Sequence, residues 1–116
     1  MQAVSYEDIR QTSSEVARDQ EREAFDRGIA LMEAARDDPD ATGPRHAATR
    51  YMQTLWSFLI RDLSDPANGL SDELKGNLMS IGLWTIRESD AILAGRSDNW
   101  AGLIDINRTV REGLSA

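Results

Sequence analysis

Three short breaks divide this chain into four stretches that can each form a helix, and they constrain the fold more than any other feature. The first break, Asp37–Pro44, holds two prolines and a glycine, which cannot continue a helical hydrogen-bond ladder. The second, Ser64–Leu70, contains a proline and the turn-forming pair Asn68-Gly69, and the third is Ala94-Gly95, where glycine suits a left-handed helix end. Because strand-like alternation is absent, the 116 residues predict one all-α domain, residues 1–116, built as a small bundle of about four helices.

The stretch before the first break, residues 1–38, is predicted to be a long amphipathic N-terminal helix. The segment Thr12–Glu15 has the pattern of a capping box, so we expect the helix to begin there. Most members of its apolar stripe are small: Ala17, Ala24, Gly28, Leu31 and Ala35, with Phe25 and Met32 beside them. Small side chains bury little area, and burial stabilises by roughly 25 cal/mol per Å². We therefore expect this helix to be the least firmly docked and to move about a hinge at Asp38–Pro44.

Residues 45–114 are predicted to form the helical core. The second helix should run from Arg45 to Leu63 and has a broad apolar face, made of Ala48, Tyr51, Met52, Leu55, Trp56, Phe58, Leu59 and Leu63. The third should begin sharply after Ser71, with the acids Asp72 and Glu73 at its positive end, and should end at Gly95.

The third helix has more apolar surface than one neighbour can cover. One stripe consists of Leu74, Leu78 and Ile81, and another of Met79, Leu83, Ile86 and Leu93, with Trp84 between them. In a four-helix bundle one stripe is covered by neighbours, so the other must be buried by the first helix, by self-association or by a partner.

The fourth helix should begin near Ser97-Asp98 and resembles a docking element, because Leu103, Ile106 and Val110 share one face. Asn107 beside this face is either a buried hydrogen-bonding residue that fixes the helix register or part of a binding surface. The three tryptophans either pack together in the core or leave one in a partner groove. We predict a partner-binding surface formed by Leu83, Trp84, Ile86, Trp100, Leu103, Ile106, Asn107 and Val110.

Composition excludes several classes of partner and site. The formal net charge is −7, and residues 1–46 alone carry eleven acids and six bases, which opposes non-specific attraction to nucleic acid or anionic lipid. Twelve of the thirteen bases are arginines, but they are scattered among acids, so no direct nucleic-acid contact is expected. The chain has no cysteine, no apolar run of about 20 residues and no signal-like start, so we expect a cytoplasmic protein without disulfides or membrane contact.

Catalytic and metal-binding patterns are also absent from the sequence. His46 is the single histidine and lies where a helix begins, without a nucleophile that it could serve as base. Asp38 and Asp40 start like a calcium loop, but the twelfth position is Thr49 where a bidentate Glu belongs. The glycines do not form a phosphate loop. We expect no enzyme activity, no metal and no cofactor.

Residues 51–114 contain an ordered set of motifs, namely Leu55-Trp56, Asp62-Leu63, Pro66–Leu70, Asn77–Trp84, Leu93–Gly95, Leu103–Arg108 and Gly113-Leu114. Taken together, these motifs resemble the FlaF family of flagellar biosynthesis regulators. Residues 1–46 match only in being a long amphipathic helix, and Ser71 stands where many members are expected to have proline.

The resemblance implies a small helical, non-enzymatic cytosolic protein that promotes flagellin synthesis and export by binding flagellin, opposite an FlbT-type translational repressor. The alternative is a post-transcriptional regulator that acts on that repressor or on flagellin mRNA and never binds flagellin. An exposed apolar groove in the folded protein would favour a peptide partner, whereas a basic surface would favour RNA.

Overall fold

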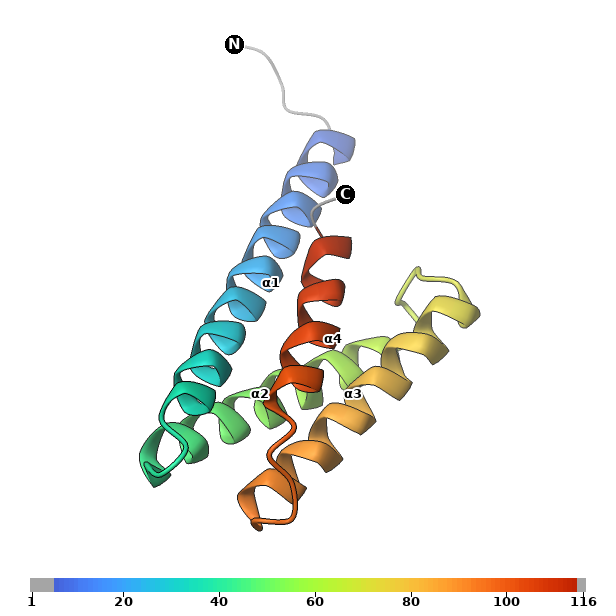
Figure 1. The fold of residues 1–116 in the computed structure, drawn as a ribbon. Coiled ribbons are helices and arrows are strands. Elements are labelled where there is room, and N and C mark those ends of the chain that lie inside the picture. Colours follow the sequence, from blue (N-terminus) through green and yellow to red (C-terminus); the bar gives the residue numbers. More distant parts are fainter. Residues whose placement is uncertain (1–5, 115–116) are drawn as a thin grey trace.

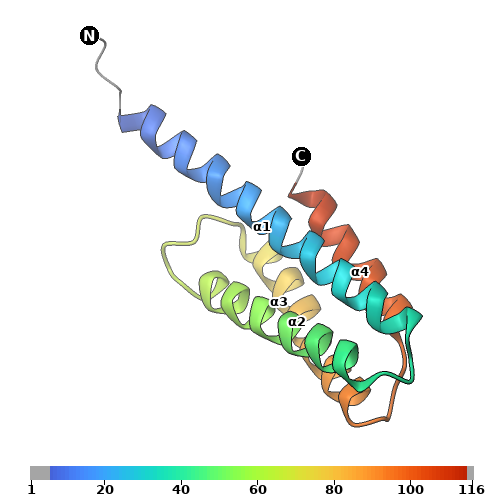
Figure 2. The same ribbon diagram turned by 90° about the vertical axis from the view of Figure 1, so that its left-hand side faces the viewer.

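The computed structural model describes the backbone of residues 6–114 and the side chains of residues 17–114. Within this part of the chain four helices and no strand form the predicted all-α bundle (Figure 1). They are α1 (Tyr6–Asp37), α2 (Thr42–Leu63), α3 (Asp72–Leu93) and α4 (Trp100–Gly113). Helix α2 packs along α3, α1 packs against both α2 and α4, and α3 and α4 contact each other only slightly (Figures 1 and 2).

The ends of α3 agree with the prediction from sequence. The Ser71 side chain accepts a hydrogen bond of 3.2 Å from the Leu74 backbone N–H, which satisfies one donor of the first turn. After the helix, Gly95 has φ of +77°, the left-handed conformation that glycine adopts at lowest cost.

The other helix starts differ from the expectation. Helix α1 already begins at Tyr6, so a start at Thr12–Glu15 is wrong; the side-chain bonds of that capping box lie outside the described residues. Helix α2 begins at Thr42, because Pro44 fits in a first turn whose N–H groups need no helical partner. Helix α4 begins at Trp100, where the Asn99 side chain accepts a hydrogen bond of 3.1 Å from the Gly102 N–H.

The core lies where α1, α2 and α4 meet, around Trp56. The ring of Phe25 on α1 contacts the Trp56 indole edge-to-face, with 5.8 Å between ring centroids. The buried hydrophobic residues of this core are Phe25, Ile29, Met32, Ala35, Ala48, Met52, Trp56, Ile92, Trp100, Leu103 and Ile104.

Helix α1 buries more area than its small residues led us to expect. Phe25 and Met32 are fully buried, and Ile29 nearly so, so the expectation that this helix buries little is wrong for its C-terminal half. The Tyr51 hydroxyl donates a hydrogen bond of 2.9 Å to the Ala24 carbonyl and ties α1 to α2. On the other side Arg111 pairs with Asp26 at 2.8 Å, which ties α1 to α4.

The fully buried face of α3 lies between its two apolar stripes and is formed mainly by small residues, namely Gly82, Thr85 and Ser89, with Ile92. A Cβ on Gly82 would lie 2.5 Å from Trp56 Cε3, so only glycine allows α2 and α3 to approach this closely. Neither leucine stripe is therefore the main contact with α2. Phe58, which we placed on the apolar face of α2, is 64% exposed.

Candidate functional site

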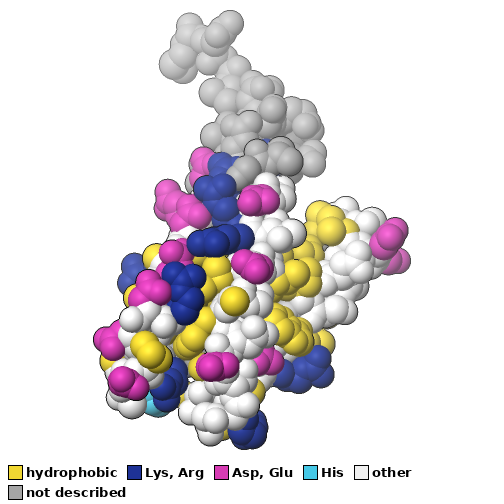
Figure 3. Space-filling model, viewed as in Figure 1, with side chains coloured by type: hydrophobic (Ala, Val, Ile, Leu, Met, Phe, Trp, Pro, Cys, Tyr) yellow, Lys and Arg dark blue, Asp and Glu magenta, His cyan; other side chains and the backbone are white. Residues whose placement is uncertain are grey.

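Helices α3 and α4 diverge from the turn that joins them and leave an apolar groove between them (Figure 1). Two cavities follow this groove, one of about 350 Å³ nearer the turn and one of about 460 Å³ at the open end, and Ile81 lines both. Hydrophobic side chains gather along the same line on the surface of the molecule (Figure 3). We call this surface the α3–α4 groove.

Each wall of the groove follows from helical spacing. Leu74, Leu78 and Ile81 recur on one side of α3 and face the larger cavity. On α4 the groove residues recur in the same way, at Gly102, Ile106, Thr109, Val110 and Gly113, and Leu114 follows at the C-cap. Leu78 and Ile81 are partly buried against the core and Leu74 is exposed, so the bundle covers this leucine stripe only in part.

The floor of the larger cavity is formed by α2, through Trp56, Leu59 and Leu63. Leu70 and Leu74 at its open end remain 41% and 43% exposed, although both are large and apolar. A contiguous apolar surface of this kind marks an interaction site more often than isolated exposed leucines do.

Two acidic side chains lie at the edge of the larger cavity. Glu21 on α1 is half-buried, and its pKa is raised, first by burial and then by the nearby charge of Asp62 on α2. Asp62 is exposed and accepts a hydrogen bond of 3.4 Å from the Asn68 side chain. The groove therefore combines apolar walls with an edge that carries two acids, Glu21 and Asp62, and one base, Arg18.

The structure places the eight predicted partner-binding residues in four environments. Trp84 and Ile106 line the smaller cavity and Val110 lines the larger one. Leu83 is 51% exposed on α3 but lines neither cavity, and Ile86 is half-buried against the core.

The remaining three predicted residues, Trp100, Leu103 and Asn107, are buried in the interior, where their side chains offer no surface to a partner. Asn107 is a buried hydrogen-bonding residue, the first of the two alternatives considered for it. Of the tryptophans, Trp56 and Trp100 are core residues, and Trp84 lines the groove.

The partner-binding surface predicted from the sequence lacks several residues that line the groove. The stripe Leu74, Leu78 and Ile81 was recognised as apolar, but nothing in the sequence said which stripe the bundle would cover. The signal that could have decided this is the Gly82, Thr85 and Ser89 series, whose spacing marks the close-packing face of α3. No sequence pattern could have placed Glu21 beside Asp62, because the two residues belong to different helices and come together only when the helices pack.

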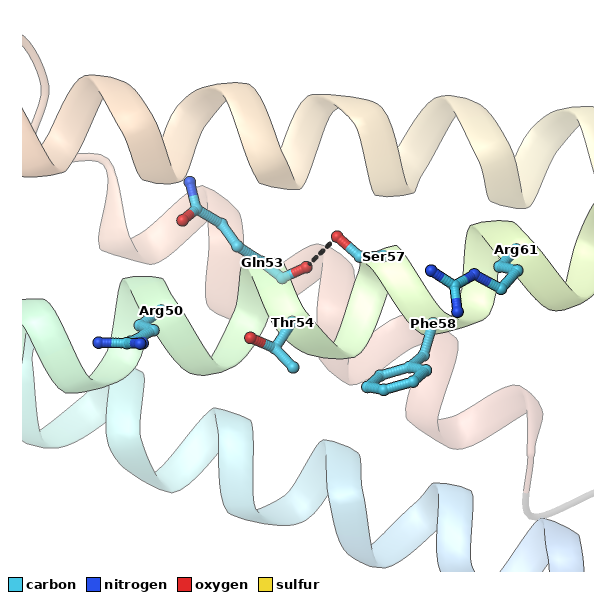
Figure 4. Close-up of a pocket in the computed structure, with 6 residues that line it drawn as sticks. All are labelled: Arg50, Gln53, Thr54, Ser57, Phe58 and Arg61. Atoms are coloured by element: carbon cyan, nitrogen blue, oxygen red, sulfur yellow. Dashed lines mark hydrogen bonds between the residues drawn. The ribbon is translucent and has the colours of Figure 1, made fainter.

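A second, shallower surface lies on the outer side of α2 and is shown in Figure 4. Its cavity of about 260 Å³ is lined by Arg50, Gln53, Thr54, Ser57, Phe58 and Arg61. The Arg61 guanidinium lies 6.0 Å from the centre of the Phe58 ring, within range of a cation–π contact. This surface is small and mostly polar, and it carries two bases, so it is weaker than the α3–α4 groove as a candidate site.

The described residues show no arrangement typical of a metal centre or a membrane span. Among the side chains of residues 17–114, no three His, Cys, Asp or Glu residues come together as ligands would. No helix in the described part of the chain combines the length and the apolar character needed to cross a bilayer. His46 is exposed near the start of α2.

Comparison with known proteins identifies the family of this chain. No curated protein and no solved structure matches it. The family described as flagellar protein FlaF matches residues 2–114, which include all of α1 as well as the segment whose motifs carry the resemblance. The match thus extends the resemblance from residues 51–114 to nearly the whole sequence, and the chain belongs to the FlaF family of flagellar proteins.

Proposed function

We propose that this FlaF-family protein is a non-enzymatic regulator of flagellum biogenesis that binds flagellin in the cytoplasm as a secretion chaperone, and so promotes flagellin synthesis and export. The observation that carries the proposal is the open apolar α3–α4 groove. Membership of a flagellar family supports the pathway, and the groove supports a protein client.

An amphipathic helix of the client fits the form of the groove. Proteins bind such helices by accepting apolar side chains at positions i, i+3, i+4 and i+7 into a hydrophobic groove. On α4 the groove extends from Gly102 to Leu114, about 18 Å at 1.5 Å per residue, which is the length of roughly three helical turns. A client helix of this length would cover the part of the leucine stripe that the bundle leaves exposed.

Two leucines on α3 offer a matched test. Leu74 and Leu83 are 43% and 51% exposed, but only Leu74 lines the groove. A charge at either position should be tolerated by the fold, whereas a charge at Leu74 should repel an apolar client. We therefore expect Leu74→Glu to abolish a flagellin complex on a sizing column and Leu83→Glu to leave it intact.

Controls separate binding from folding and from charge. Circular dichroism must show both variants folded, and the wild-type complex should persist as ionic strength rises, because apolar contacts are not screened by salt. The same column shows whether the protein alone associates with itself through the groove. Equal binding by the two folded variants, or a complex that nuclease dissolves, would contradict the proposal.

The second candidate function is regulation through the FlbT-type repressor or flagellin mRNA without flagellin binding. The α2 surface of Figure 4 favours it, since an exposed aromatic ring under an arginine can stack on a nucleic-acid base. Phe58→Ala combined with Arg61→Gln should then abolish retention of flagellin mRNA or of the repressor, with flagellin binding unaffected. If the double variant retains both partners as well as the wild type does, this candidate fails.

A further inference from the structure

We propose that the flagellin segment held in the α3–α4 groove is an amphipathic helix with a lysine or arginine at one end, and that this cation lies between Glu21 and Asp62. The inference rests on the proposed function and goes further by stating the chemistry of the client. The client helix should bury its apolar side chains along the groove and place its charged residue at the groove's open end.

The first support is position. Glu21 comes from α1 and Asp62 from α2, and both line the same cavity as Leu74 and Val110. An apolar side chain and a cation on one helix face could therefore contact the leucines and the two acids at once. The opposite end of the groove, at Trp84 and Ile106, has no acidic residue in its lining.

The second support is that the two acids repel each other in the free protein. Half-burial of Glu21 and the nearby charge of Asp62 both act against the ionised form of Glu21. Asp62 lies in the last turn of α2, where the helix dipole is also negative. A cation placed between these two carboxylates would relieve both unfavourable interactions.

The charges nearby leave room for such a cation. Arg22 is already engaged, because it donates a hydrogen bond to the Leu114 carbonyl and pairs with Asp19. Arg18 lines the same cavity, so this edge of the groove has one base beside the two acids. The segment from 62 to 73, which leads into α3, contains four acids and no base. The open end of the groove therefore favours a positively charged partner.

The inference can be tested with peptides that tile flagellin in segments of about 18 residues, a length chosen to exceed three helical turns. Binding is measured by fluorescence anisotropy against wild type, Glu21→Gln, Asp62→Asn and Asp105→Asn. Asp105 is an exposed acid on α4 outside the groove, so its variant changes the net charge as the others do. For the peptide that binds tightest, we expect each groove variant to raise Kd by about two- to fivefold at low salt, as for partly exposed ion pairs.

The Asp105→Asn control should leave Kd unchanged, and replacing the basic residue of the peptide with glutamine should remove the effect of both groove variants. If the peptide binds but the groove variants behave like Asp105→Asn, the inference is wrong and the proposed function stands. If no flagellin peptide binds, the proposed function fails instead.

A pair of designed peptides tests the inference without flagellin. Both have the same leucine stripe, and one ends in lysine where the other ends in glutamine. We expect the lysine peptide to bind wild type more tightly than the glutamine peptide, and this preference to disappear in Glu21→Gln and in Asp62→Asn. Equal affinity for the two peptides would overturn the inference.

Discussion

The indole N–H of Trp56 donates a hydrogen bond of 2.8 Å to Oδ1 of Asn107, and this bond joins α2 to α4 inside the core. The Asn107 amide N–H₂ in turn donates to the Leu103 carbonyl at 2.8 Å and reaches the Thr85 hydroxyl on α3 at 3.5 Å. One buried side chain thus links its own helix, α4, to both α2 and α3. It fixes the position of α4 beside a groove where α3 and α4 otherwise barely touch, so the shape of the groove depends on it.

Asn107→Leu should lower the free energy of unfolding by about 1–3 kcal/mol, because the buried Trp56 N–H loses its acceptor. Urea unfolding followed by circular dichroism measures the change. Asn77→Leu is the matched control, since Asn77 is exposed on α3, and it should change stability by less than about 0.5 kcal/mol. If Asn107→Leu lowers the free energy of unfolding by less than about 0.5 kcal/mol, the Trp56–Asn107 bond does not hold the core together.

Gly82→Ala should destabilise the protein by about 1–3 kcal/mol, because the new Cβ would lie 2.5 Å from the rigid Trp56 ring and force α2 and α3 apart. At Gly76 on the same helix an added Cβ would meet no atom within 4 Å. Gly76→Ala should therefore stabilise the protein by up to about 1 kcal/mol, because alanine has the higher helix propensity. Opposite signs for the two substitutions, measured by thermal unfolding, are the expected result. A neutral Gly82→Ala would show that the helices can separate at little cost.

The sequence predicted the helical architecture well because helix breakers act locally. The proline and glycine residues between the helices break the backbone ladder locally, and Ser71 and Gly95 act as predicted at the two ends of α3. The packing of α1 was misjudged for a different reason. The prediction relied on the small residues of its apolar stripe. The area that α1 buries comes instead from Phe25, Ile29 and Met32, which are buried only once the helices pack together.

The candidate site was predicted only in part, because a helix with two apolar stripes does not say which one its neighbours cover. Trp84, Ile106 and Val110 are predicted partner-binding residues, and all three line the groove. Trp100, Leu103 and Asn107 belong to the same apolar region of α4, but their side chains are buried in the interior of the bundle. The acids Glu21 and Asp62 are 41 positions apart and meet only in the folded chain.

Glu21→Gln should stabilise the protein at neutral pH. The pKa of Glu21 is raised above its ordinary value of 4.5, so the folded state disfavours the ionised carboxylate. Its stability contribution is therefore present below the unfolded pKa and is lost as pH rises through the raised folded pKa. The Tm difference between variant and wild type should be positive at neutral pH and vanish below about pH 4, where the carboxyl is protonated in both states.

Asp26→Asn should have the opposite effect on Tm. The hydrogen bond from Arg111 lowers the pKa of Asp26 below 3.8, so its contribution is present above the unfolded pKa and is lost as pH falls through the lowered folded pKa. This variant should reduce Tm at neutral pH, by a small amount because the pair is exposed. Equal signs for the two variants would contradict the assigned causes of the pKa shifts.

Amide hydrogen exchange should show the C-terminal half of α1 protected as strongly as the middle of α2. Amides from Phe25 to Ala35 lie on a helix that buries Phe25 and Met32 in the core, and opening this helix would expose both. The comparison is with amides from Met52 to Leu59. Much faster exchange in α1 would restore the sequence-based hypothesis of a helix that moves about residues 38–44.

Trp84 should account for most of the tryptophan fluorescence that acrylamide can quench. Trp56 and Trp100 are only 1% and 6% exposed, whereas Trp84 is half-buried and lines the smaller cavity of the groove. A collisional quencher must touch the indole, so Trp84→Phe should remove most of the quenchable signal. Flagellin bound in the groove should then protect wild type from acrylamide and leave the residual quenching of Trp84→Phe unchanged. If the variant is quenched as strongly as wild type, the solvent-accessible indole is a different one, and the groove does not extend to Trp84.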